Sequence, residues 1–180
     1  MEENVKNEES KRRGLWELVR VVLISVLIVL PIRTYIAQPF IVSGDSMLPN
    51  FHNGEYLIID ELTYQFREPK RGEVVVFRFP LNASDFFIKR IIGLSGETIE
   101  IKNGQLSVNG TILPEDYLPK NIETAPEVRI TLGQNQYFVL GDNREHSSDS
   151  RSWGALEKSK IMGRALLRLW PVAKAGMVGY

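Results

Sequence analysis

Two residues of the sequence, a serine and a lysine, have neighbours suited to nucleophilic catalysis. Ser46 lies in Ser-Gly-Asp-Ser-Met-Leu-Pro, residues 43–49, a turn-like stretch where backbone N–H groups can be exposed. Lys89 lies in Phe-Phe-Ile-Lys-Arg-Ile-Ile, residues 86–92, whose apolar side chains could keep water from its amine. A serine hydroxyl needs a base to attack an amide, and a lysine is that base only where desolvation lowers its pKa. The pair therefore predicts amide hydrolysis by a Ser–Lys dyad.

The surroundings of Lys89 decide between this prediction and simpler ones. Strand alternation puts Lys89 on the same face as Phe87 and Ile91, and puts Arg90 on the other face as a solvent-side charge. If the lysine faces inward, burial disfavours its charged form. A pKa shift from about 10.4 to about 7 corresponds to roughly 4–5 kcal/mol of lost preference for the ammonium over the neutral amine. The alternatives are an edge-strand lysine that points to water and, for Ser46, an ordinary turn serine.

Other catalytic groups are scarce in this chain. Histidine occurs twice and cysteine is absent, so thiolate chemistry and a histidine-rich metal site are disfavoured. His52 or His146 could in principle be the base, and His146 with Asp142 or Asp149 is the only plausible triad. Acidic and basic residues balance at 22 each, which argues against nucleic acid as a partner. We expect no metal and no organic cofactor, and rank the triad below the lysine.

A polar loop spans residues 142–152 and reads Asp-Asn-Arg-Glu-His-Ser-Ser-Asp-Ser-Arg-Ser. It follows an apolar strand and precedes Trp153-Gly154. An exposed loop is the simpler interpretation. Its alternating acids and arginines also allow it to fold on itself through charge-assisted hydrogen bonds and to present a hydroxyl in a defined place.

The N-terminal region has the pattern of a membrane anchor. Residues 1–14 form a polar tail that contains Lys-Arg-Arg, and the apolar run 21–32 follows. A span needs about 20 apolar residues, so we predict a transmembrane helix over 15–36 with its charged residues near the two interfaces. A cleaved signal peptide is disfavoured because cleavage after Ala37 puts Tyr35 at −3, and a buried core helix because a polar face is missing. The positive-inside rule places the tail in the cytoplasm and residues 37–180 outside.

Residues 37–180 read as one mainly β domain. Short β-branched and aromatic runs predict strands, and no long amphipathic helix interrupts them. Asn103-Gly104 and Asn109-Gly110 are hairpin turn signals. The predicted strands cover 55–60, 73–79, 87–92, 98–101, 105–108, 128–131, 136–140 and 161–169, of which the last has a spacing that also suits a helix.

Four motifs in this order, after an N-terminal anchor, resemble the type I signal peptidases along nearly the whole chain. They are Ser-Gly-Asp-Ser-Met-Leu-Pro at 43–49, Arg-Gly-Glu-Val-Val-Val-Phe at 71–77, Ile-Lys-Arg-Ile-Ile-Gly-Leu-Ser-Gly-Glu at 88–97 and Gly-Asp-Asn-Arg-Glu-His-Ser-Ser-Asp-Ser-Arg-Ser-Trp-Gly at 141–154. The resemblance implies coiled antiparallel β-sheets and an active site that faces the membrane. It implies Ser46 as the acylated nucleophile, Lys89 as the general base and Ser147 as the hydroxyl that orients the lysine. It also implies that Met47 lines the substrate site and that four charged residues hold the active-site loop: Asp142, Arg144, Asp149 and Arg151.

One position departs from part of that family. Some members carry a serine two residues before the nucleophile, whose hydroxyl helps to bind the oxyanion, whereas this chain has Gly44 and resembles the Gly-Asp-Ser-Met subgroup. Ser43 would point elsewhere by strand alternation. The oxyanion site would then depend on the backbone N–H of Ser46 and on a second donor that the sequence does not identify.

The expected function is removal of N-terminal signal peptides from exported preproteins. The enzyme would be a single-pass protein of the cytoplasmic membrane, with signal peptides and the lipid bilayer as partners and small residues such as alanine selected at −1 and −3. Two alternatives are open: another Ser–Lys protease of similar fold, such as the self-cleaving repressors, and a tethered β-domain that binds peptides without cleaving them.

Overall fold

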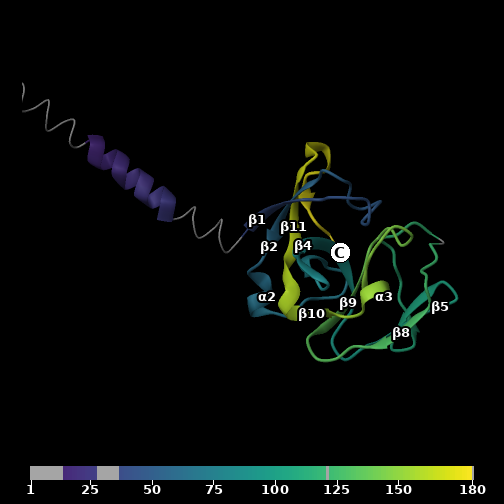
Figure 1. The fold of residues 1–180 in the computed structure, drawn as a ribbon. Coiled ribbons are helices and arrows are strands. Elements are labelled where there is room, and N and C mark those ends of the chain that lie inside the picture. Colours follow the sequence, from purple (N-terminus) through teal and green to yellow (C-terminus); the bar gives the residue numbers. More distant parts are fainter. Residues whose placement is uncertain (1–13, 28–36, 121, 180) are drawn as a thin grey trace, which may run out of the picture. The chain divides into compact units, whose positions relative to one another are not determined.

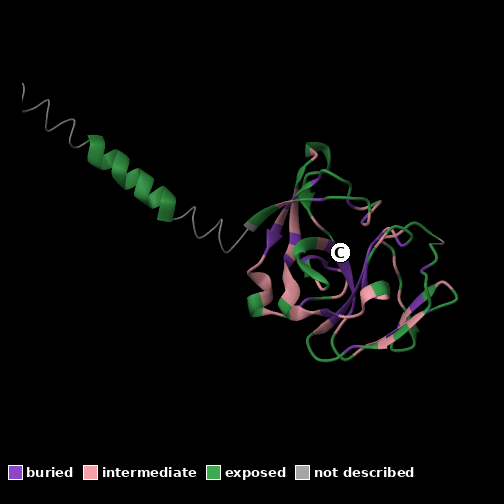
Figure 2. Ribbon diagram, viewed as in Figure 1, coloured by how far each residue is buried: buried purple, intermediate pink, exposed green. Residues whose placement is uncertain are grey.

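The computed structural model describes residues 14–27, 37–120 and 122–179 and divides the chain into two units, residues 1–37 and 38–180 (Figure 1). In the first unit a helix covers residues 14–27, and all of its side chains are exposed (Figure 2). No helix in the described part of the chain has the length and apolar character needed to cross a bilayer. Residues 28–36, the second part of the predicted anchor, lie outside the described residues.

The second unit contains a large antiparallel sheet and a small one. The strand order of the large sheet is β1-β2-β11-β3-β4-β9-β10, and β12 pairs with β11. These strands are β1 (Ala37–Ile41), β2 (Tyr56–Asp60), β3 (Val74–Phe79), β4 (Asn82–Gly93), β9 (Gln136–Leu140), β10 (Leu156–Glu157), β11 (Ile161–Trp170) and β12 (Gly176–Met177). The small sheet has the order β7-β6-β5-β8, with β5 (Thr98–Lys102), β6 (Gln105–Val108), β7 (Thr111–Ile112) and β8 (Val128–Thr131).

Short helices lie between the strands. They are α2 (Thr63–Phe66), α3 (Ser150–Trp153), η2 (Lys158–Lys160) and η3 (Val172–Lys174). The mainly β fold with antiparallel sheets predicted from the sequence is therefore confirmed, and the uncertain segment 161–169 is a strand. The turn between β5 and β6 is also confirmed, because Asn103 and Gly104 both have positive φ angles, 50° and 77°, as a two-residue hairpin turn requires. Strands β1, β7, β10 and β12 were not predicted, because runs of two to five residues carry little periodicity.

The core is built mainly around most of β3 and β9 and the second half of β4, where consecutive residues are buried, whereas residues 82–86 of β4 are exposed (Figure 2). Strand β4 pairs with β3 along its length, whereas β9 pairs with it only from Arg90 to Gly93. The first part of β4 thus lacks a neighbouring strand on one side among the described residues. The expected place of Arg90 on the solvent side is wrong: this residue is 3% exposed, because β4 is an interior strand at that point.

Candidate active site

The structure brings Ser46 and Lys89 into direct contact. Ser46 lies in the turn that follows β1, and Lys89 lies in β4, opposite Val75 of β3. Lys89 Nζ is 2.8 Å from Ser46 Oγ and also donates a hydrogen bond of 2.8 Å to the carbonyl of Ile88. At this distance the hydroxyl proton of the serine could pass directly to a neutral amine.

The amine of Lys89 is kept away from water. The residue is 3% exposed, and its Nζ lies 5.2 Å from the centroid of the Phe87 ring. Burial lowers the pKa of Lys89 to about 8, while the more distant carboxylates of Asp149 and Asp142 act in the opposite direction. A substantial share of the amine is therefore neutral at mildly alkaline pH.

The turn that carries Ser46 is held by the start of the polar loop. The N–H of Asn143 donates to the carbonyl of Ser46 and its side-chain amide donates to the carbonyl of Asp45, each at 3.1 Å. Gly141 permits this close approach, because a Cβ there would lie 2.5 Å from the carbonyl oxygen of Ser46 and 2.2 Å from Ser147 Oγ. The N–H of Ser46 itself donates to no acceptor in the described part of the chain, so it is available to an incoming oxygen.

The charged residues of the polar loop form buried ion pairs. Asp149 is fully buried, caps α3, accepts from the N–H of Gly141 at 3.0 Å and pairs with Arg151 at 2.8 Å. Asp142 accepts two hydrogen bonds from Arg90, at 2.8 and 2.7 Å. Asp142 and Asp149 therefore each have an arginine partner, and these charge-assisted hydrogen bonds hold the loop in place, as its composition allowed.

The same loop is tied to neighbouring segments. Arg144 donates to the carbonyl of Gly141 and pairs with Glu115 from the segment after β7. Asn50, four residues beyond Ser46, donates to Asp142 at 2.8 Å and to the carbonyl of Tyr117 at 2.9 Å. These contacts link the turn that carries Ser46, β4 and the loop into one network.

Other residues singled out from the sequence have different surroundings. Ser147 Oγ is buried without a hydrogen-bond partner among the described residues, so the predicted orientation of Lys89 by this hydroxyl is not made in this state. Met47 is 1% exposed and packs in the core with Ile88 and Val74, so its role in lining the substrate site stays a prediction. His52 contacts Glu55 rather than Ser46.

The histidine triad finds no support in the contacts of its members. His146 is exposed, and the carboxylates of Asp142 and Asp149 are engaged with Arg90 and Arg151. No group of three or more metal-ligating side chains occurs in the described residues.

A cavity of about 600 Å³ lies beside the dyad. It is bordered by β1 and by the part of β4 that β9 leaves unpaired. Phe40 of β1 and Phe86 of β4 meet edge to face, with ring centroids 6.1 Å apart. The lining residues are Phe40, Ile41, Ser43, Gly44, Asp45, Ser46, Ser84, Asp85, Phe86, Phe87, Ile88, Lys89, His146 and Ser148.

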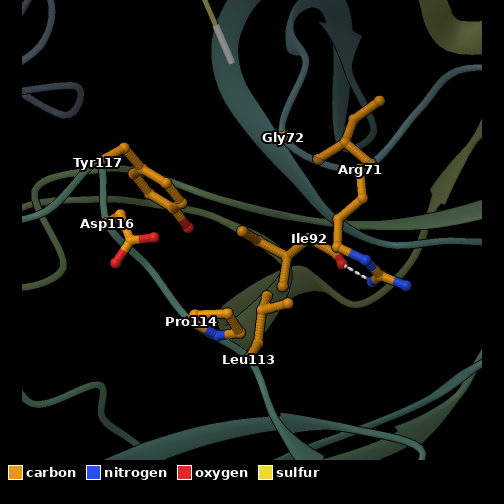
Figure 3. Close-up of a pocket in the computed structure, with 8 residues that line it drawn as sticks. Arg71, Gly72, Ile92, Leu113, Pro114, Asp116 and Tyr117 are labelled. Carbon is orange, nitrogen blue, oxygen red and sulfur yellow. Dashed lines mark hydrogen bonds between the residues drawn. The ribbon is translucent and has the colours of Figure 1, made fainter.

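A second hollow, of about 500 Å³, is separate from this cavity and shares no lining residue with it. Figure 3 shows Arg71 on one side and Asp116 and Tyr117 on the other, with Leu113 and Ile92 between them. Arg71 is already engaged there, because its guanidinium donates to the carbonyl of Ile92 and pairs with Glu97. Arg71, the arginine of the second motif, thus contacts the end of β4 rather than the dyad.

Sequence reasoning missed two members of the network. Arg90 was assigned to solvent because alternation alone does not show that both faces of β4 are buried. Asn50 received no role, since an asparagine after a proline is typical of any turn. The sequence offered one signal for these two residues: Arg90 directly follows Lys89, and Asn50 directly follows the motif at 43–49.

Several known proteins are similar to this chain in sequence. A family model described as "Signal peptidase, peptidase S26" matches residues 15–170. "Probable signal peptidase I-2" of Synechocystis sp. is 38% identical over 99% of this chain and 86% of its own length. "Signal peptidase I S" of Bacillus subtilis is 37% identical over 90% of this chain and 92% of its own length. A crystal structure of a signal peptidase I from Enterococcus faecalis is 33% identical and covers 54% of this chain and 97% of its own, with a TM-score of 0.49. The family match spans more than half of the sequence and includes both Ser46 and Lys89, and the chain therefore belongs to the signal peptidase family, peptidase S26.

Proposed function

We propose that this protein is a membrane-anchored serine endopeptidase that cleaves signal peptides from exported preproteins, with Ser46 as nucleophile and Lys89 as general base. The observation that carries the proposal is the buried amine of Lys89, 2.8 Å from Ser46 Oγ at the edge of a cavity. Family membership supports the same substrate class, because the named relatives are signal peptidases.

The reaction follows from the contacts of the two residues. Neutral Lys89 takes the proton of Ser46 as the hydroxyl attacks the scissile carbonyl, and the resulting ammonium then protonates the leaving amine. The backbone N–H of Ser46 stabilises the oxyanion. In the second half of the reaction Lys89 activates a water that hydrolyses the acyl-enzyme. No step requires a metal or an organic cofactor.

The substrate would bind as an extended strand in the cavity between β1 and β4. The unpaired edge of β4 before Arg90 offers backbone groups for main-chain hydrogen bonds with a peptide. Phe86 and Ile88 would border the side chains at −1 and −3, so that small residues fit and large ones do not. The polar loop keeps the nucleophile turn in place while the peptide binds, through Asn143.

We propose the domain layout of the sequence: a cytoplasmic tail at 1–14, an anchor at 15–36 and an extracytoplasmic catalytic domain at 37–180. Its support is the apolar run 21–32 and the basic residues that precede it. The chain has no cysteine, so single cysteines can test the topology. In intact spheroplasts a membrane-impermeant maleimide should label Lys102→Cys and leave Asn7→Cys unlabelled, and the reverse pattern would contradict the orientation.

The function is tested with a synthetic preprotein that carries an Ala-x-Ala site. Full-length enzyme in detergent should cut it after the second alanine, as mass analysis of the product will show. Ser46→Ala and Lys89→Ala should each lower the rate by about 10⁴-fold or more, because loss of one member of a catalytic unit removes most of its effect. Lys102→Ala, a change of an exposed lysine in β5, is the matched control.

Two results would contradict the proposal. Cleavage at the wild-type rate by either dyad variant would show that another pair does the chemistry. Failure of a serine-reactive acylating probe to label Ser46 in the wild-type protein would favour the alternative of an inactive peptide-binding domain.

A further inference from the structure

The two ends of the cavity beside the dyad differ in chemistry. The part of the cavity between β1 and β4 carries the large apolar side chains Phe40, Ile41 and Phe86, and it is also lined there by the polar Ser84 and Asp85 of β4. At the end near the nucleophile the cavity is lined by polar side chains, Asp45 and His146, both of them exposed. A peptide that runs through the cavity therefore meets large apolar side chains only on the side formed by β1 and β4.

The chain connections show which end lies at the dyad. The chain leads from β1 through Ser43 to Ser46, and β4 runs along the cavity to Lys89, so the two segments converge at the reacting pair. The polar loop meets them there, because Asn143 donates to the carbonyls of Ser46 and Asp45. Asp45 and His146 thus lie beside the nucleophile, away from the apolar border formed by β1 and β4.

The direction of the substrate follows if the proposed function is correct, and the inference rests on it. In a preprotein the apolar and small residues precede the scissile bond, and the mature protein begins after it. The part before the bond suits the apolar end of the cavity. The residue that follows the scissile bond would then lie against Asp45 and His146.

We propose that Asp45 and His146 form the subsite for the side chain immediately after the scissile bond, and that the carboxylate of Asp45 makes this subsite favour a basic residue and disfavour an acidic one. Asp45 takes part in no ion pair among the residues that the structure describes, so its charge is not cancelled by a neighbour. Because Asp45 is exposed, the selection should be modest, about threefold for one unit of charge. It should weaken as salt screens the interaction.

The experiment compares three peptides that share one Ala-x-Ala site and carry lysine, glutamine or glutamate directly after it. The kcat/KM of each is measured with full-length enzyme in a zwitterionic detergent at low salt. Wild type should cleave in the order lysine, glutamine, glutamate. The measured quantity is the kcat/KM of the glutamine peptide divided by that of the glutamate peptide. Asp45→Asn should reduce this ratio by about threefold, and His146→Glu should increase it by a similar factor.

Each ratio is internal to one enzyme, so a general loss of activity in a variant does not affect it. Asp116→Asn removes the same charge at an exposed position in the separate hollow of Figure 3 and should leave the ratio as in wild type. The inference is overturned if the peptides are cleaved and the ratio in Asp45→Asn stays as in wild type. If Asp45→Asn does not fold, His146→Glu decides alone, since His146 is an exposed loop residue. Absence of cleavage of all three peptides by wild type would overturn the proposed function, and the subsite with it.

Discussion

The two faces of β4 carry neighbouring cationic residues that are buried to the same degree and treated in opposite ways. Lys89 and Arg90 are each 3% exposed. Arg90 has a carboxylate partner, because Asp142 accepts two of its N–H groups, and its guanidinium lies 4.1 Å from the centroid of the Tyr117 ring. Lys89 has no carboxylate within hydrogen-bond distance among the described residues, and its contacts are a hydroxyl, a carbonyl and an aromatic ring.

The difference shows how one strand can carry both a structural charge and an amine that can lose its proton. A buried guanidinium stays protonated in proteins and is tolerated only when its donors are satisfied. A buried amine without a carboxylate can lose its proton instead, and the pKa of Lys89 is correspondingly lowered to about 8. Because Asp142 lies on the Arg90 side of the strand, the guanidinium has a carboxylate partner and the amine of Lys89 has none within hydrogen-bond distance among the described residues.

The largest effect on stability should come from removing Arg90, the buried cation that is paired with Asp142. Arg90→Met leaves the Asp142 carboxylate buried without its arginine, and the free energy of unfolding should fall by about 3–5 kcal/mol. Urea denaturation followed by tryptophan fluorescence will measure this. Arg129→Met is the matched control, because the Arg129–Glu100 pair is long, at 3.7 Å, and its arginine side chain is 74% exposed. That change should cost less than about 1 kcal/mol. Equal losses in the two variants would contradict the assigned importance of the buried pair.

Replacement of Lys89, on the opposite face of β4, should change the free energy of unfolding in the opposite direction. Lys89→Met should raise the free energy of unfolding by about 3 kcal/mol at pH 7, since a pKa of about 8 against a reference of 10.5 means that the folded state disfavours the charge. Between pH 8 and 10.5 the unfolded chain binds more protons than the folded one, so wild-type stability rises with pH in this window. The gain of the variant should therefore be full below pH 8 and vanish near pH 10.5. A gain that does not change between pH 7 and 10.5 would contradict the lowered pKa.

This pair of residues also marks the limit of what the sequence could predict. Local patterns were sufficient for the hairpin turn at Asn103-Gly104 and for the strands on either side of it, because these depend on neighbours in the chain. The contact of Ser46 with Lys89 was expected from their chemistry and from the family resemblance. The environment of Arg90 was not predictable in the same way. It depends on a pairing with Asp142, fifty-two positions away, and on β9 covering only one part of β4.

The pH dependence of the reaction gives a second test of Lys89, the buried cation without a carboxylate partner. For the free enzyme, kcat/KM should rise with pH through an acid-side limb with an apparent pKa of about 8, the value for Lys89. Below that limb the rate should fall by about tenfold per pH unit, because only the neutral amine accepts the serine proton. Initial rates on the Ala-x-Ala preprotein between pH 6 and 10 will show it. A flat profile over this range would mean that a different group limits the reaction.

The smallest effect concerns Ser147, whose hydroxyl is buried beside Gly141 without a partner among the described residues. Such a group usually costs about 1–3 kcal/mol, so Ser147→Ala should leave the free energy of unfolding unchanged or slightly raised. If the hydroxyl turns to Lys89 when substrate binds, kcat should nevertheless fall by about tenfold, in the range expected for one lost hydrogen bond to a charged group. Ser107→Ala in the small sheet, where the hydroxyl donates to the carbonyl of Glu100, should leave kcat as in wild type. An unchanged kcat in Ser147→Ala would show that Ser46 and Ile88 alone position the amine of Lys89. Lys89 would then be held by fewer polar contacts than Arg90.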